Sequence, residues 1–254
     1  MLTSYTPDEE VVLEKNPNYW GEATNVDKYI LKIQPDANTQ MMTLSTGDID
    51  VALNLTDDTM DELKSADNVE IVDGTTKMIG FVMMNMDEQY GGPVSNPDVQ
   101  KAIRKALDYS GIRMICGEGT LTPYSIIQDG FMGSKGERPD DYTNLDEAKQ
   151  LLADAGYPNG EGFPVVEYLY NTSDAHKAVA EALQFMWEEE LGVKVTLNNQ
   201  EWAAFLQTRK DGDYSIARNG WIADYNDPIS FLDMWMTGGG NNDAPVSYTH
   251  LRAH

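Results

Sequence analysis

Residues 175–199 read AHKAVAEALQFMWEEELGVKVTLNN, and the spacing of their apolar residues changes partway along. In the first part the apolar residues recur every three or four positions, which predicts a helix with Val179, Leu183 and Trp187 facing inward. Gly192 ends this helix, because glycine readily adopts the left-handed conformation found after helix C-termini. VKVTLNN then alternates apolar and polar residues as a strand does. A helix followed directly by a strand predicts an α/β fold.

The same mixture of helices and strands extends on both sides of this stretch. Apolar spacing, caps and turn residues predict these elements. In the second part of the chain they are helices over 97–107, 145–156 and 200–210, a strand over 214–221, and mostly loop over 117–143.

The first part of the chain predicts a second α/β region with a strand–helix–strand–helix–strand order. Pro7 and Asp8 supply the turn of a hairpin over 4–15, and Thr56 is placed to cap a helix. We place the boundary between the two regions at 85/86. The further predicted elements are strands over 29–34, 50–55 and 69–75 and helices over 38–47 and 56–67.

The last nine residues, VSYTHLRAH (246–254), do not continue either region. They hold two of the three histidines and one arginine after a long acidic sequence. We interpret 246–254 as a non-native tail and assign it no function, which leaves 86–245 as the second region.

The charge of the chain excludes some classes of function. It has 42 Asp and Glu against 18 Lys and Arg, a net charge of −24, and such a surface repels nucleic-acid phosphates. It has no apolar run of the roughly 18 residues that a membrane-spanning helix needs. The single cysteine, Cys116, excludes an internal disulfide and a cysteine-based zinc site.

Residues 220–235, GWIADYNDPISFLDMW, combine carboxylates with large aromatic residues. A carboxylate among aromatic side chains needs a partner for its charge. Two roles are open for Asp224, namely contact with a ligand or capping of the helix expected near Pro228. Asp227 is better placed for capping, because it directly precedes that proline.

Enzymatic function has little support in the sequence. The acid pairs Asp140–Asp141 and Glu188–Glu190 suggest glycoside hydrolysis at most, and a solvated surface explains them more simply. Motifs for a serine nucleophile, a zinc protease, a phosphate loop or a dinucleotide site are absent from the sequence. His176, the one histidine outside the tail, has no partner in view. We expect no catalytic residue, no cofactor and no metal.

Four ordered stretches resemble the extracellular solute-binding proteins of ABC importers, family 5, which include oligopeptide-, dipeptide- and nickel-binding members. Together they are far more specific than any one alone, and the resemblance covers essentially residues 4–244. The stretches are VVLEKNPNYWGE (11–22), MTLSTGDIDVA (42–52), NPDVQKAIRKALDYSGI (96–112) and RKDGDYSIARNGWIADYNDPISFLDMW (209–235).

This resemblance implies part of a two-lobed periplasmic-binding-protein type II fold, truncated at both ends. Residues 1–85 would be part of the hinge-proximal lobe, and 86–245 most of the second, ligand-binding lobe. Family members are much longer, so we expect an internal fragment whose gene continues upstream into a signal peptide and continues downstream. The upstream part could carry a lipid-attachment cysteine.

The resemblance also implies the binding residues. Asp224 matches the family aspartate that pairs with the α-amino group of a bound peptide, and Trp221 and Tyr225 lie beside it. Arg218 and Arg209 match positions that can offer a cation to a carboxylate. A cleft wall or core position remains open for Trp221, and for Arg209 a surface ion pair is the preferred alternative.

The function that the resemblance implies is capture of short peptides outside the cell, in the periplasm or on the outer face of the membrane. The partners would be the peptide and an ABC permease, with the protein a monomer. Alternatives within the family are a nickel chelate, haem or an oligosaccharide. A chain poor in cysteine and histidine argues against a directly bound metal.

Overall fold

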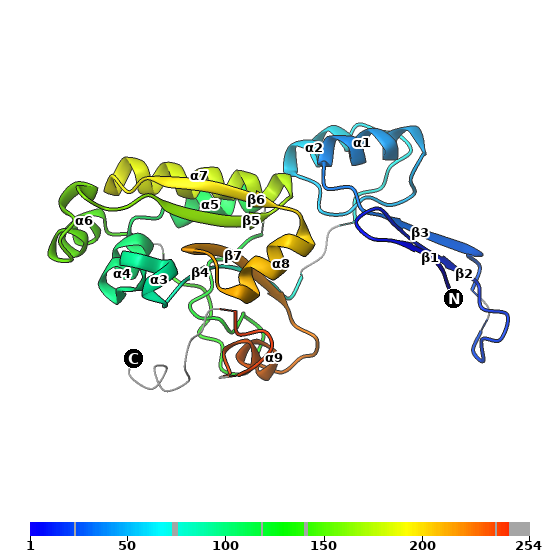
Figure 1. Cartoon of the computed structure of the whole chain (residues 1–254). Coiled ribbons are helices and arrows are strands. Elements are labelled where there is room, and N and C mark those ends of the chain that lie inside the picture. The colour runs from blue at the N-terminus through cyan, green and yellow to red at the C-terminus, as the bar shows by residue number, and fades with distance from the viewer. Residues whose placement is uncertain (23, 73–75, 118, 140–141, 237, 244–254) are drawn as a thin grey trace. The chain divides into compact units, whose positions relative to one another are not determined.

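The computed structural model describes residues 1–254 except 23, 73–75, 118, 140–141, 237 and 244–254 (Figure 1). The chain forms two compact units, Met1–Ile71 and Val72–His254. None of the described helices is long and apolar enough to cross a membrane.

Unit 1 contains a three-stranded antiparallel sheet in the order β1-β2-β3 and two helices. The predicted hairpin is confirmed, with Val11 opposite Tyr5 on one side and Leu31 on the other. The predicted helix caps are also confirmed, because Thr56 accepts the Thr59 N–H and Gly47 adopts the left-handed conformation. The elements are β1 Leu2–Thr6, β2 Glu10–Glu14, β3 Lys28–Lys32, α1 Ala37–Thr46 and α2 Asp57–Leu63.

Two strands predicted in this region are corrected by the structure. No strand forms over 50–55, where Asn54 has a φ of 60°, a left-handed conformation that an extended strand does not contain. Of the segment 69–75, residues 69–72 are not strand, and 73–75 lie outside the described residues. The predicted strand–helix alternation is therefore wrong for unit 1, whose sheet comes entirely from the first 32 residues.

Unit 2 contains a four-stranded mixed sheet in the order β4-β7-β5-β6. β5 is parallel to both β6 and β7, whereas β4 is antiparallel to β7. The elements are β4 Met78–Met84, α3 Glu88–Gly91, α4 Pro97–Lys105, α5 Tyr109–Cys116, α6 Leu145–Asp154, β5 Val166–Asn171, α7 Asp174–Leu191, β6 Val195–Gln200, α8 Trp202–Asp211, β7 Ile216–Ile222 and α9 Ile229–Leu232. Short 3₁₀ turns follow α3, α6 and α9.

β5 is an inner strand of this sheet and was not among the predicted elements. Tyr168, Leu169 and Tyr170 are consecutive and buried, so the strand lacks the apolar–polar alternation of a half-exposed strand. Tyr168 and Tyr170 join the core on one face, whereas Leu169 joins the core on the other. The pattern of β5 is that of a strand covered on both sides.

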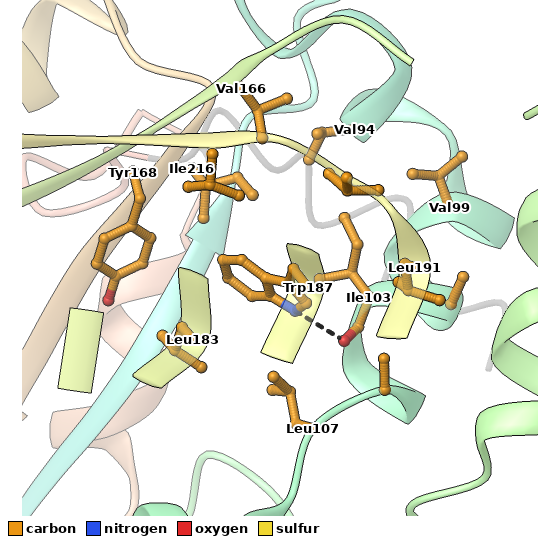
Figure 2. Close-up of a cluster of buried hydrophobic side chains, with 14 of the residues drawn as sticks. Val94, Val99, Ile103, Leu107, Val166, Tyr168, Leu183, Trp187, Leu191 and Ile216 are labelled. Atoms are coloured by element: carbon orange, nitrogen blue, oxygen red, sulfur yellow. Dashed lines mark hydrogen bonds between the residues drawn. The ribbon is translucent and has the colours of Figure 1, made fainter. Parts of the chain in front are cut away.

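Helices cover both faces of the unit 2 sheet. The larger core lies between the sheet and α4, α6 and α7, and α7 runs alongside β5 and β6 (Figure 1). Figure 2 shows Trp187 within this core, where its indole N–H donates to the carbonyl of Ile103 at 3.1 Å. On the other face, Phe205 of α8 packs with Leu169 and Ala217. The helix predicted over 175–192 thus supplies Trp187, the largest fully buried side chain among the described residues.

The two units divide between Ile71 and Val72, whereas the sequence places its boundary at 85/86. The difference is β4, which pairs along its whole length with β7, from Met78 opposite Ile222 to Met84 opposite Ile216. These hydrogen bonds join residues far apart in the chain and make β4 part of unit 2. The predicted tail 246–254 lies outside the described residues.

Candidate functional site

The candidate site lies at the edge of the unit 2 sheet where the parallel strands end. β5, β6 and β7 end at Asn171, Gln200 and Ile222 respectively, and their parallel direction brings these ends to the same edge. Ligands of open α/β sheets bind at the carboxyl ends of strands. Thr172 follows β5 and donates to Asn199 at 3.0 Å, so this edge is polar.

Ser230 fixes the start of the loop that follows β7. Its buried hydroxyl accepts the indole N–H of Trp221 at 3.2 Å and the backbone N–H of Asp224 at 3.1 Å. The Trp221 ring packs against the apolar cluster that includes Phe231 and Met234. Trp221 is therefore a half-buried residue packed against this core, its role as a cleft wall stays a prediction, and the backbone at Asp224 is held in place.

The two aspartates of this loop have different surroundings. Asp227, one position before the N-cap Pro228, accepts the N–H of Ile229, the first residue of α9, at 2.9 Å, so its carboxylate takes the capping role at the start of this short helix. The Asp224 side chain is exposed, and no donor to its carboxylate is found in the described part of the chain. The structure thus assigns the capping role to Asp227, and the ligand role of Asp224 stays a prediction.

Tyr225 lies among negative charges. Desolvation, followed by the charges of Asp233, Asp227 and Asp224, raises the pKa of its hydroxyl. The ring is about half exposed. A surface where three carboxylates lie near a half-exposed tyrosine suits a cationic group.

Arg218 lies on β7 and is half-buried, with its Nη1 donating to Oδ1 of Asn171 at 3.2 Å. Burial lowers the pKa of Arg218, although a guanidinium remains charged at neutral pH. Within the described ranges no carboxylate pairs with it. Arg218 is therefore a partly desolvated cation held by a neutral amide.

His176, near the start of α7, is a neighbour of Arg218 that the sequence analysis left without a partner. Its Nδ1 lies 3.3 Å from the carbonyl oxygen of Asn171. Burial, and then the positive charge of Arg218, lowers the pKa of His176 to about 4, so its ring is neutral at pH 7. Asn171 contacts both side chains, His176 through its backbone carbonyl and Arg218 through its side-chain amide. A local sequence pattern does not predict this arrangement, because Arg218 lies 47 residues after Asn171.

Arg209 differs from the other predicted binding residues. It is only 7% exposed, and its Nε donates to Oδ2 of Asp243 at 3.1 Å, with a second bond from Nη2 to the same oxygen. Its guanidinium also lies 5.0 Å from the ring centroid of Phe205. The alternative of an ion pair therefore describes Arg209 better, although the pair is buried rather than on the surface.

The acid pairs weighed as hydrolase residues have structural partners. Glu188 accepts the N–H of Val195 at 3.1 Å, and Glu190 pairs with Lys149 at 3.5 Å. Asp140 and Asp141 lie outside the described residues. Among the residues that the structure describes, no group of three or more His, Cys, Asp or Glu side chains is placed to hold a metal.

Comparison with solved structures defines the class of protein. The oligopeptide-binding protein OppAIV of Borrelia burgdorferi matches with a TM-score of 0.82 and 30% identity, covering 97% of this chain and 48% of that one. Haemophilus influenzae OppA, solved with the peptide RPPGFSPFR, matches with a TM-score of 0.80 and 26% identity over 98% of this chain and 50% of that one. The fold is thus that of part of a periplasmic solute-binding protein, as the resemblance predicted.

The chain belongs to the bacterial extracellular solute-binding proteins, family 5, whose model matches residues 1–243. Periplasmic oligopeptide-binding protein OppA of Salmonella typhimurium is 33% identical over 251 residues, covering 96% of this chain and 46% of the relative. Dipeptide-binding protein DppE of Bacillus subtilis is 31% identical over 250 residues, covering 95% and 45%. The chain therefore spans about half the length of these relatives, which are named as peptide-binding proteins.

Proposed function

We propose that this chain is part of the substrate-binding component of an ABC importer that captures short peptides outside the cell. The component acts in the periplasm or on the outer face of the membrane, as a monomer, and delivers its ligand to a membrane permease. The relatives' names support this proposal, since OppA and DppE are oligopeptide- and dipeptide-binding proteins. No catalysis is part of the proposal.

The observation that carries this proposal is the exposed carboxylate of Asp224. Its backbone is fixed by Ser230, its neighbour Asp227 supplies the helix cap, and the surroundings of Tyr225 are acidic. An α-ammonium group would form a charge-assisted hydrogen bond with this carboxylate, and the backbone bond to Ser230 reduces the ordering that binding must impose on the loop. Asp224 is thus assigned to the peptide's amino end, with Trp221 and Tyr225 beside it.

Arg218 is assigned to the opposite charge of the ligand, either its terminal carboxylate or an acidic side chain. Its guanidinium is charged, half-buried and held by the neutral amide of Asn171. A carboxylate of the ligand would pair with this guanidinium through two parallel N–H···O hydrogen bonds, the geometry that arginine favours. The neutral His176 beside it adds no second charge to the site. Arg209 is left out of the proposed site because Asp243 already pairs with it.

A second class of ligand remains the main alternative. Heme-binding protein A of Haemophilus influenzae is 27% identical over 237 residues, so this family also contains a protein named for haem. A nickel chelate and an oligosaccharide are further alternatives. The opposite charges of Asp224 and Arg218 favour a ligand with both an ammonium and a carboxylate, which a peptide has and an oligosaccharide lacks.

Calorimetry on the protein expressed from its complete reading frame tests the proposal. Asp224→Asn is expected to weaken binding of short peptides with a free amino end by about 2–5 kcal/mol, the scale for removing one partner of a buried charge pair. Binding of N-acetylated peptides, which have no α-ammonium group, should weaken much less. The matched control is Asp233→Asn, which removes a nearby exposed carboxylate that also acts on Tyr225.

Two results would contradict the proposal. Binding of haem, a nickel chelate or an oligosaccharide without any response to peptides would overturn the ligand class. Equal losses for free and acetylated peptides would show that Asp224 supports the loop rather than the ligand's amino group.

A further inference from the structure

We propose that Lys77 is a positioning residue that holds the loop carrying Asp224 in its ligand-binding conformation. This inference rests on the proposed function, because it takes Asp224 as the group that receives the peptide's amino end. Lys77 directly precedes β4. Its backbone carbonyl accepts the N–H of Ala223 at 3.0 Å, which extends the β4–β7 pairing one step beyond Met78 and Ile222.

The side chain of Lys77 makes a second attachment to the same loop. Its ammonium Nζ donates to Oδ1 of Asn226 at 2.7 Å, across 149 positions of sequence. The same ammonium lies 4.5 Å from the ring centroid of Phe131, a cation–π distance. Phe131 is itself buried and packs edge-on against Phe231, with centroids 5.1 Å apart. Lys77 thus connects Asn226 to a fixed aromatic core.

These two attachments enclose the candidate binding residues. Ala223 is held through its backbone and Asn226 through its side chain, and Asp224 and Tyr225 are the residues between them. In the described part of the chain, Lys77 is the one donor to the Asn226 side chain. Restricting a loop before binding reduces the ordering that binding must otherwise supply. Lys77 therefore contributes to affinity without contacting the ligand.

The partners of Lys77 also argue against a role in an ion pair. Its ammonium interacts with an amide oxygen and a ring face, and among the described residues no carboxylate pairs with it. Several other lysines of this acidic chain do pair with acids, including Lys101 and Lys149. The geometry of Lys77 is that of a clamp between Asn226 and Phe131.

The test is Lys77→Met in the complete protein, since methionine keeps an unbranched apolar stem and removes the ammonium. Binding of a short peptide with a free amino end should weaken roughly three- to tenfold, the scale for immobilising one or two side chains. Binding of N-acetylated peptide should change little, and the melting temperature should fall by no more than about 2–4 °C because the ammonium of Lys77 is exposed. Lys194→Met, an exposed lysine before β6, is the matched control and should bind as the wild type does.

Two further variants separate positioning from a general effect of charge. Asn226→Ala should reproduce the loss, and the double variant should lose no more than either single one, because both remove the same contact. Lys77→Arg should restore most of the affinity. Wild-type affinity in Lys77→Met, or tighter binding after the ammonium is removed, would overturn the inference.

A measurement on the ligand-free protein makes this inference separable from the proposed function. Backbone amide exchange at Asp224 and Asp227, whose N–H groups donate to Oγ of Ser230 and to the carbonyl of Tyr225, should be faster in Lys77→Met than in the wild type, and unchanged in Lys194→Met. Unchanged exchange would overturn the positioning role even if peptides bind. Faster exchange in a protein that ignores peptides would instead show that the proposed function has failed while the clamp exists.

Discussion

His176 shows how one residue's surroundings change its chemistry. Burial and the nearby Arg218 hold its pKa at about 4, below the ordinary value of 6.5. Between these two values the unfolded chain binds a proton that the folded protein does not. The stabilisation that comes from the lowered pKa of His176 is therefore fully present above pH 6.5 and is lost as the pH falls toward 4.

We expect His176→Asn to reduce the dependence of unfolding free energy on pH in this window. Asparagine keeps a polar side chain of similar reach but does not titrate, whereas the many carboxylates affect wild type and variant alike. The measurement is denaturant unfolding of both proteins at pH 4.5, 5.5 and 6.5. The quantity compared is the difference in unfolding free energy between wild type and variant at each pH. Parallel curves would show that His176 titrates normally.

Arg209 and Asp243 form a pair whose members are both nearly buried, with side chains 9% and 8% exposed. We expect Arg209→Met to destabilise the protein by about 3–5 kcal/mol, because it leaves the carboxylate buried without its partner. The double variant Arg209→Met/Asp243→Leu should recover most of this loss. Denaturant unfolding measures both, and a stable Arg209→Met protein with weaker peptide binding would return Arg209 to the ligand site.

At the scale of elements, α7 and α8 end in the same way but in different surroundings. Gly192 and Gly212 both follow their helices in the left-handed conformation, with φ values of 69° and 73°. A Cβ at Gly192 would lie 2.2 Å from the carbonyl oxygen of Asn159, whereas a Cβ at Gly212 would meet nothing within 4 Å. The turn after α6 therefore packs directly against the end of α7.

These two glycines form a matched pair for mutation. Gly212→Ala should cost about 1–2 kcal/mol, the cost of a left-handed conformation for a residue with a Cβ. Gly192→Ala should cost about 3 kcal/mol or more, because it adds a backbone clash to the same conformational cost. Thermal or denaturant unfolding gives both values. Equal losses would show that the contact with Asn159 relaxes freely.

At the scale of the whole molecule, the net charge of −24 acts against folding. Carboxylates repel one another more strongly in the compact state than in the unfolded chain. The paired acids, such as Glu147 between Lys101 and Lys105 at 2.8 and 2.9 Å, are too few to neutralise this excess. Salt should therefore stabilise the protein.

We expect the melting temperature to rise between about 0.01 and 0.15 M NaCl, as the Debye length falls from about 30 to about 8 Å. Each kcal/mol of repulsion removed should add about 2–4 °C. Replacing NaCl by KCl at equal ionic strength is the control for ion-specific effects. A falling melting temperature would mean that surface ion pairs contribute more than the overall repulsion.

The sequence by itself determined the elements whose stabilising interactions are local. The spacing of Val179, Leu183 and Trp187, the glycine after α7 and the proline at the start of α4 each act within a few residues, so periodicity and caps predicted them. Motif resemblance placed the chain in its family, and the family model confirms this. The predicted binding residues came from the same resemblance. Those of the proposed site, Asp224 among them, stay predictions, whereas Arg209 pairs with Asp243 instead.

Only the tertiary structure decided which distant segments meet. β5 has no distinctive period because both its faces are covered, and β4 joins unit 2 because it pairs with β7. The bond between Arg218 and Asn171 and the clamp of Lys77 on Asn226 likewise join segments 47 and 149 residues apart. Such contacts depend on strand order, and a local sequence pattern carries no information about strands that are not its neighbours along the chain.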